Sequence, residues 1–323
     1  MAIKLATTFP TMDLGTDPGT LRTWAQGVEE IGFDEIYIPE HVVGVDTTRR
    51  PDWRPLNPNT LKSGPPLYGH TTPFLEPCVA LGFLAAVTHT IGLMSGILVL
   101  PQRQTALVAK QIAIADILSQ GRVRLGIGSG WNDAEFAALG SEFKGRGNRM
   151  DEQIGVLRRL WTEESVSFSG SYHEFDAVGI CPLPQQRPVP IIVGGDSRRA
   201  MLRAAHVGDG WFVTGTVDQV SDRARSYWGE VDRAGRDRSD QSLIGTLYLG
   251  TRDPHELADE IRTWASLGAT HLNIRTSSYP VQWRDGKAIK RPDVSDHVDA
   301  LWAIAKVATV LGLSEAGNRQ LMC

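Results

Sequence analysis

A histidine at the end of a predicted strand is the first candidate for chemistry in this chain of 323 residues. His41 lies in the segment IPEHVVG, directly after the apolar run Glu35 to Pro39, which we interpret as a buried strand. Histidine as a residue type gains and loses a proton near neutral pH and is therefore suited to general acid–base catalysis. Glu40 is placed to orient the ring. The alternative is an ordinary loop histidine that is hydrogen-bonded to a neighbour.

A glycine-rich loop, GIGSG at residues 126–130, ends another candidate strand. Because glycine has no Cβ, the backbone of Gly128, Ser129 and Gly130 is able to approach a ligand closely. A dinucleotide fingerprint would need a third glycine where the chain has Trp131, and it would need an acidic partner further on, so that interpretation fails. The serine is also not at the centre of the GxSxG spacing of hydrolases. Trp131 either forms a wall of the substrate pocket or has a packing role.

A second pair of glycines, Gly194 and Gly195, ends a strand and precedes a helix that Asp196 or Ser197 is suited to cap. Free amide groups at the N-terminus of a helix favour an anion, and the glycines give it room. This pattern predicts a phosphate site, which Thr214 after the next strand would complete. The alternative is an ordinary tight turn with a helix cap.

Composition limits the classes of partner. The net charge of −4 gives no general attraction to nucleic acid or to an anionic membrane, so we expect a small-molecule partner. Three scattered cysteines, Cys78, Cys181 and Cys323, are typical of reduced cytoplasmic thiols. No apolar run reaches transmembrane length. The HExxH pattern is absent and no two histidines are four residues apart, so we predict no metal site.

The order of elements explains how these side chains would be positioned. Strands and helices alternate in eight pairs over one domain, residues 1–323, which is typical of an α/β fold of the (β/α)8 TIM-barrel type. The predicted strands are Ala2 to Thr8, Glu35 to Pro39, Ile91 to Leu100, Val123 to Ile127, Pro190 to Val193, Gly210 to Val213, Ser242 to Leu249 and His271 to Ile274. The predicted helices are Pro18 to Ile31, Pro77 to Thr88, an amphipathic one with Leu107, Ile112, Ala115 and Leu118 on one side, Arg149 to Glu163, one from Asp196 or Ser197, Val217 to Ala234, Pro254 to Leu267 and Asp296 to Leu311.

Three segments stand outside this alternation. Val166 to Phe175 reads as a hairpin turned by Ser169-Gly170. The polar insert Val45 to Phe74 and the segment Thr276 to Pro292 both follow the ends of strands. Barrel enzymes place their substrate loops there, so we expect insertions at the C-terminal mouth of the barrel.

The motifs together resemble a known family. The segments that carry the resemblance are Glu40-His41-Val42, Leu98 to Arg103, Gly126 to Trp131 with Glu135-Phe136, and Val193-Gly194-Gly195. The chain is similar to the luciferase-like monooxygenase superfamily, and within it to the oxidoreductases that use the deazaflavin coenzyme F-420. The resemblance extends from about Ile3 to about Val213 and weakens in the last third.

This resemblance implies a barrel with the cofactor across its C-terminal mouth. It implies that His41 faces the reactive edge of the ring, that Glu40 contacts the cofactor, and that a non-proline cis peptide at Ser95-Gly96 backs the ring. A plain glycine in a packed strand is the alternative at the last position.

The resemblance extends to the rest of the cofactor and to assembly. It places the cofactor phosphate at Gly194 and Gly195 and the cofactor side chain at Arg149, although a surface arginine is equally plausible. Some family members carry a catalytic glutamate at the position of Trp131, so their acid catalyst and their sugar-phosphate substrate are not expected here. The resemblance further implies a homodimer.

The sequence therefore predicts an oxidoreductase that moves a hydride between coenzyme F-420 and a small organic substrate. One alternative is a monooxygenase of the same superfamily that uses reduced FMN and oxygen. A second alternative is a cofactor-binding relative without turnover.

Overall fold

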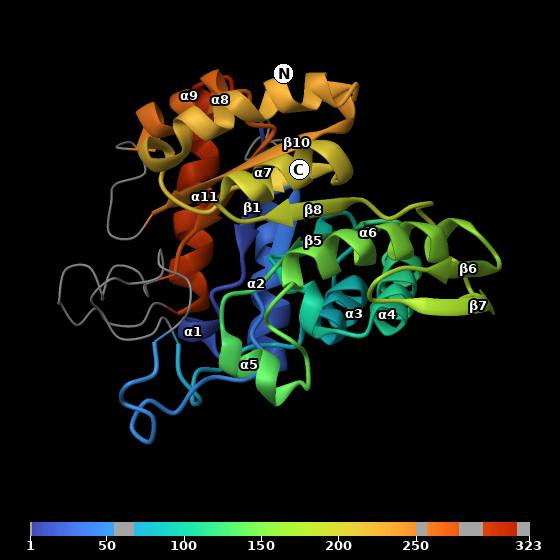
Figure 1. The fold of residues 1–323 in the computed structure, drawn as a ribbon. Helices are drawn as coiled ribbons and strands as arrows, with labels where there is room; N and C mark the ends of the chain where they lie inside the picture. Colours follow the sequence, from blue (N-terminus) through green and yellow to red (C-terminus); the bar gives the residue numbers. More distant parts are fainter. Residues whose placement is uncertain (1, 55–67, 250–256, 278–292, 315–323) are drawn as a thin grey trace.

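Parallel strands close into a barrel in the computed structural model of this protein, which describes residues 2–54, 68–249, 257–277 and 293–314 (Figure 1). Around the ring the strands are β3 (Gly92–Ser95), β2 (Glu35–Ile38), β1 (Lys4–Thr8), β11 (His271–Arg275), β10 (Ser242–Tyr248), β9 (Gly210–Phe212), β8 (Ile191–Gly194) and β5 (Val123–Gly128). The ring closes because β3 also pairs with β5. The predicted (β/α)8 barrel is confirmed.

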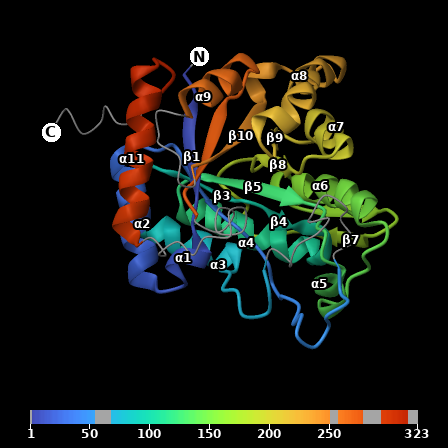
Figure 2. The ribbon, with the colours of Figure 1, turned by 90° about the vertical axis from the view of Figure 1, so that its left-hand side faces the viewer.

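A helix follows each strand on the outside of the ring, and α11 lies beside α2, where the last helix meets the first (Figure 2). These helices are α2 (Pro18–Ile31), α3 (Pro77–Val87), α4 (Thr105–Leu118), α6 (Arg146–Thr162), α7 (Arg198–Val207), α8 (Val217–Arg233), α9 (Ala258–Ser266) and α11 (Val294–Val310). Short additions are α1 (Thr11–Leu14), α5 (Asp133–Ala138) and the 3-10 turns η1 (Leu100–Gln102) and η2 (Arg238–Asp240). The predicted hairpin is present as β6 (Val166–Ser169) and β7 (Glu174–Val178).

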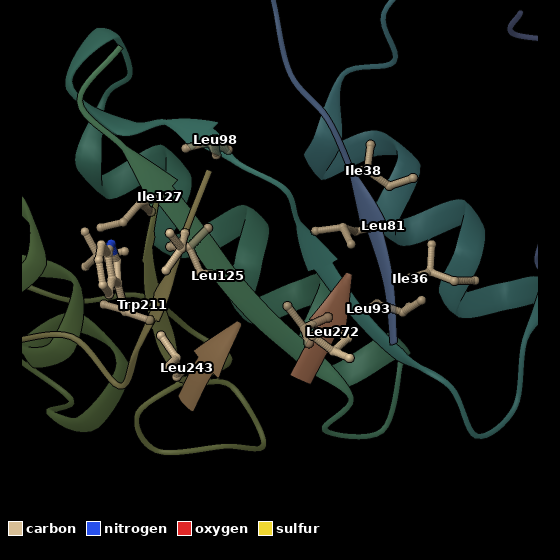
Figure 3. Packing of buried hydrophobic residues seen from close by; sticks show 14 of the residues in the cluster. Ile36, Ile38, Leu81, Leu93, Leu98, Leu125, Ile127, Trp211, Leu243 and Leu272 are labelled. Carbon is tan, nitrogen blue, oxygen red and sulfur yellow. The ribbon is translucent and has the colours of Figure 1, made fainter. Parts of the chain in front are cut away.

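Alternation along each strand divides the core in two, because successive side chains of a strand point to opposite faces of the sheet. On β2, Ile36 and Ile38 point outward and pack with Leu81 of α3 in the main core between sheet and helices (Figure 3). A smaller set of side chains packs inside the ring: Ala6, Tyr37, Met94, Ile192, Phe212 and Ile244. This inner plug fills the barrel below its C-terminal mouth.

The amino-terminal half of the barrel interior is polar. Arg124 donates to Glu35 (2.7 Å) and to Ser242 (2.8 Å), and Tyr37 donates to Glu35 (2.7 Å). Burial alone would raise the pKa of Glu35, but Arg124 and His271 lower it to about 2. The buried charges are thus paired, as buried charges generally must be, and they lie at the end of the barrel away from the site.

Three predictions are wrong in detail. The apolar run Ile91 to Leu100 is not one strand: β3 ends at Ser95, and a two-residue strand β4 (Leu98–Val99) follows beside β5. The non-proline cis peptide joins Gly96 and Ile97, one residue later than the predicted Ser95-Gly96. On α4, Leu107 and Leu118 are 51% and 59% exposed and do not face inward.

The start of the helix predicted at Pro254 and most of the segment Thr276 to Pro292 lie outside the described residues, as do residues 55–67 of the polar insert. In the part that the structure describes, no helix is both long enough and apolar enough to cross a membrane. The same residues contain no group of three or more His, Cys, Asp or Glu side chains placed to hold a metal ion.

Candidate active site at the barrel mouth

The candidate residues gather at one end of the barrel because all strands of the ring run parallel. Each follows or ends a strand at its carboxyl end: Glu40 and His41 after β2, Ser95 and Gly96 at β3, Gly128 to Trp131 at β5, Gly194 to Ser197 at β8, and Thr214 after β9. Arg149 lies in the first turn of α6, which begins after the loops that follow β5. The parallel topology thus brings residues more than 170 positions apart to the same end of the barrel.

His41 is held by a carboxylate from a distant segment. Its Nδ1 lies 3.3 Å from Oε2 of Glu135, and Oε1 of Glu135 accepts hydrogen bonds from the backbone amides of Val42 and Val43. The His41 side chain is 15% exposed and that of Glu135 is 2% exposed. With Nδ1–H directed at the carboxylate, Nε2 of the ring is left to meet a ligand.

The first turn of α5 positions both Glu135 and an aromatic neighbour of His41. Asn132 caps α5, because its Oδ1 accepts from the amides of Ala134 (3.1 Å) and Glu135 (3.3 Å). Its Nδ2 donates to the hydroxyl of Tyr68 (2.8 Å), and the Tyr68 ring stacks on His41 with centroids 3.8 Å apart. A single buried amide therefore connects the carboxylate and the ring that hold His41.

Aromatic side chains surround His41 on its other sides. Phe74 and Trp131 meet its ring edge-on, with centroids at 5.1 and 5.5 Å, and both also contact Tyr68. Burial and then the charge of Glu135 raise the pKa of Tyr68 above its usual range, so its hydroxyl stays protonated. His41, Tyr68, Phe74 and Trp131 thus form one aromatic cluster, in which Trp131 lies beside the candidate base His41.

Glu40 does not orient His41. It is 4% exposed, and it accepts from the backbone amide of Val99 and from the guanidinium of Arg103, which also binds Glu76 (2.7 Å). Burial raises the pKa of Glu40, and Arg103 only partly offsets that effect. The carboxylate beside His41 is that of Glu135, and the groups that Glu40 contacts belong to the segment after β3.

Ile97, which follows the cis peptide, explains several glycines. A Cβ on Gly128 would lie 2.3 Å from Cδ1 of Ile97, and a Cβ on Gly194 would lie 2.5 Å from the same atom. A Cβ on Gly96 would lie 2.7 Å from that of Tyr37. These glycines therefore let the Ile97 side chain cover the apolar plug at the mouth, where it packs partly buried. Ser95 is buried and donates to the carbonyl of Gly126 (2.7 Å).

Two adjacent strand-to-helix turns carry glycines with positive φ. Gly195 after β8 has φ +122° and Gly215 after β9 has φ +121°. The amide of Gly195 donates to the carbonyl of Phe212 (3.1 Å), which ties the two turns together. Ser197 is the N-cap of α7, and its hydroxyl accepts from the amide of Ala200 (3.1 Å). Ser197, Arg198 and Arg199 at the start of α7 are exposed at this end of the barrel.

Other candidate residues border this end of the barrel. Thr214 is exposed beside Gly215, Asp196 is half-buried, and Ser129 and Gly130 are half-buried at the end of β5. Arg149 has a buried Nε without a hydrogen-bond partner among the described residues. A buried donor that lacks an acceptor is costly, so this Nε is a candidate for a hydrogen bond to a ligand.

Sequence reasoning missed the roles of Glu135, Asn132 and Tyr68. Asn132 followed three residues later by Glu135 has the spacing of a helix-capping pair, in which the glutamate reaches back to its own helix. Here the glutamate instead crosses to the loop after β2, 94 residues away. The local signal was present in the sequence, but it identified a helix start and not its partner.

Glu135→Gln should change which ring nitrogen of His41 carries the proton. The new amide oxygen is expected to keep the amides of Val42 and Val43, so its NH2 group faces Nδ1 and forces that nitrogen to accept. We expect turnover to fall by about 10- to 100-fold, with ring-nitrogen NMR reporting the Nε2–H tautomer. Glu142→Gln, on an exposed loop residue, is the matched control. An unchanged tautomer would exclude Glu135 as the group that orients His41.

Comparison with known proteins agrees with this architecture. A family model described as luciferase-like monooxygenase matches residues 2–309. An uncharacterized protein of Mycobacterium tuberculosis is 30% identical over 269 residues, which are 81% of this chain and 88% of that protein. An FMNH2-dependent dimethylsulfone monooxygenase of Pseudomonas fluorescens is 38% identical over 151 residues, 46% of this chain and 41% of the relative.

Solved structures share the fold. An F-420-dependent secondary alcohol dehydrogenase, solved with an F-420–acetone adduct, superposes with a TM-score of 0.72 over 95% of this chain and 99% of its own. Its sequence is 16% identical, so the similarity shows the common barrel.

Proposed function

Because the chain belongs to the luciferase-like monooxygenase family, we propose that it is an oxidoreductase that moves a hydride between coenzyme F-420 and a small organic substrate. The observation that carries the proposal is His41, held by Glu135 at the carboxyl end of β2 with its ring 15% exposed. When a hydride leaves an alcohol carbon, a proton must also leave the hydroxyl oxygen, and the reverse reaction must return it. His41 is the group placed to exchange that proton.

The residues of the mouth fit a cofactor that carries a phosphate. The deazaflavin supplies or accepts the hydride when it is bound, and the protein supplies orientation and electrostatics. The exposed amino terminus of α7, beside Gly195 and Gly215, suits the phosphate. The buried Nε of Arg149 offers a donor to the cofactor side chain. Trp131 and Tyr68 would exclude water around His41.

A monooxygenase that uses reduced FMN and oxygen is the second candidate. It is favoured by the 38% identity to the FMNH2-dependent dimethylsulfone monooxygenase. FMN also carries a phosphate, so the α7 site does not decide between the two cofactors.

Titration of the purified protein with F-420 and with FMN tests the proposal. Quenching of the fluorescence of the nine tryptophans reports binding, and oxygen consumption with reduced FMN reports monooxygenase turnover. We expect tighter binding of F-420 and hydride transfer without oxygen uptake. Tighter binding of FMN with oxygen uptake would establish the second candidate, and binding without any turnover would indicate a non-catalytic relative.

We further infer that a second copy of the chain covers the outer face of α3 and α4. Val79 and Leu107 on this face are 72% and 51% exposed, and α3 has no charged residue. The Lys110 ammonium on α4 is engaged with the carbonyl of Cys181. An apolar face without opposing charge suits a self-complementary contact, because homodimer interfaces are more apolar than other surfaces.

Val79→Glu and Leu107→Glu together should convert this dimer to monomer in sedimentation velocity. Both positions lie near the amino termini of their helices, where an acidic side chain favours the helix. Val310→Glu, at the 87% exposed last position of α11, adds the same charge outside this face and should leave the dimer intact. A monomeric wild-type protein would refute the interface.

A further inference from the structure

The barrel mouth is polar along one arc, formed by β1, β10 and β11. On the neighbouring strands β10 and β11, Thr246 is paired with Asn273, and both side chains point into the barrel. Two residues nearer the mouth, Tyr248 is paired with Arg275 in the same way. Thr8 at the end of β1 donates to Asn273. By contrast, glycines and the Ile97 side chain occupy the arc of β3, β5 and β8. None of the proposed cofactor contacts lies on β1, β10 or β11, so the polar arc has no assigned role.

Asn273 on this arc has a donor that no described residue accepts from. Asn273 is 1% exposed, and its Oδ1 accepts a hydrogen bond from the Thr8 hydroxyl (3.0 Å). Its Nδ2 is buried and has no hydrogen-bond partner in the residues that the structure describes. The neighbouring Thr246 hydroxyl donates to the carbonyl of Val213 (3.1 Å) and is not within hydrogen-bonding geometry of this Nδ2. An amide so placed is able to donate to a ligand bound at the mouth.

Arg275, two residues further along β11, has the same deficiency with a positive charge. Its Nε is buried without a partner, and no ion pair to a carboxylate reaches its guanidinium within the described ranges. Its recorded contact is the Tyr248 ring, 5.9 Å from the guanidinium carbon. The carboxylates nearer to the site are engaged elsewhere, Glu40 with Arg103 and Glu135 with His41. A half-buried arginine without a counter-charge is the usual means of binding an oxyanion.

We propose that Arg275 and Asn273 form an oxyanion subsite that holds a carboxylate or sulfonate group of the substrate. The inference rests on the proposed function, because it takes the glycine arc for the cofactor and leaves this arc to the substrate. The two donors lie two residues apart on one strand and therefore face the same side of the sheet. The planar guanidinium offers two parallel donors to one anionic group, and Asn273 adds a neutral donor. The substrate class is an organic anion.

Methanesulfonate and dimethylsulfone test this class, because they have the same heavy-atom framework and differ by one charged oxygen in place of a methyl group. Calorimetric titration of the wild-type protein at low ionic strength should give an affinity for methanesulfonate about 10- to 100-fold higher than for dimethylsulfone. Arg275→Met should abolish this preference. Arg275→Lys keeps the positive charge but loses the two parallel N–H donors of the guanidinium, so it should retain only part of the preference. Asn273→Asp should weaken the binding of methanesulfonate, because it places a second negative charge beside the anion.

Arg225→Met is the matched control, since it removes the same charge from an exposed position of α8. It should leave the preference unchanged, and circular dichroism of each variant verifies the fold. Equal affinities for the two probes in the wild-type protein, or a preference that survives in Arg275→Met, would overturn the subsite.

The cofactor phosphate is the other possible source of an anion. If Arg275→Met weakens a phosphorylated cofactor and spares its dephosphorylated form, the subsite belongs to the cofactor and the assignment to substrate is wrong. If neither F-420 nor FMN binds while the two probes are still distinguished through Arg275, the proposed function fails and the subsite stands. The two failures are therefore distinguishable.

Discussion

Replacing His41 with alanine is expected to lower turnover by about 10²–10⁴-fold, the usual contribution of a positioned acid–base group. The ring is held by Glu135 and stacked on Tyr68, so it is oriented before any ligand arrives. Its loss should weaken the cofactor only slightly, because one hydrogen bond to a neutral ring edge contributes about 1 kcal/mol. Steady-state turnover and fluorescence titration of the cofactor measure the two effects separately.

His89→Ala is the matched control for that experiment. His89 is exposed, and it lies before β3 at the opposite end of the barrel from the mouth. Its removal should change neither turnover nor cofactor affinity. If His41→Ala instead retains wild-type turnover, His41 is a structural loop residue and the proton is exchanged by another group.

The barrel was predictable because its signal is local. A buried parallel strand reads as a short apolar run, and an outer helix reads as a periodic stripe, so eight alternations identify the fold without any knowledge of contacts. The cap of α7 was predictable for the same reason, since Ser197 needs only the amide of Ala200 three residues away. Boundaries agree to within a few residues wherever a cap or a proline marks them, as Asp17 and Pro18 do for α2.

Apolarity alone did not distinguish a strand from its interruption. Ser95 is the one polar side chain between Ile91 and Leu100, yet Ile97 leaves the sheet to cover the inner plug of the barrel. Likewise Leu107 and Leu118 of α4 are 51% and 59% exposed, although their residue type does not distinguish them from the buried apolar positions of the same helix. Composition reports that a side chain avoids water, and it does not report which surface covers it.

The groups that hold His41 could not be paired from the sequence. Glu135 and Tyr68 are 94 and 27 positions from His41, and their contacts depend on how the mouth loops fold over the barrel. Glu40 is the nearest carboxylate along the chain, yet it is committed to Arg103. Glu40 and His41 are neighbours in the turn after β2, but their side chains point in different directions. The sequence therefore suggested Glu40, and not Glu135, as the partner of His41.

Gly195→Val should weaken a phosphorylated cofactor by about 10- to 100-fold, the value of one charge-assisted hydrogen bond or slightly more. Gly195 has φ +122°, where a side chain is strained, and a Cβ there would lie 3.3 Å from that of Ala200. Its own amide is already bonded to Phe212, so the amides that meet the phosphate follow it at the start of α7. The substitution acts by displacing the turn that aims those amides.

Comparison with the dephosphorylated cofactor isolates the phosphate contact, because displaced amides cannot weaken a ligand that lacks the phosphate. Gly235→Val is the matched control for backbone strain, since Gly235 also has a positive φ (+66°) and has open space around it. It follows α8 and precedes β10, and so lies at the opposite end of the barrel. It should lower thermal stability without changing the affinity for either form. If Gly195→Val weakens both forms equally, the turn after β8 supports packing alone and the phosphate binds elsewhere at the mouth.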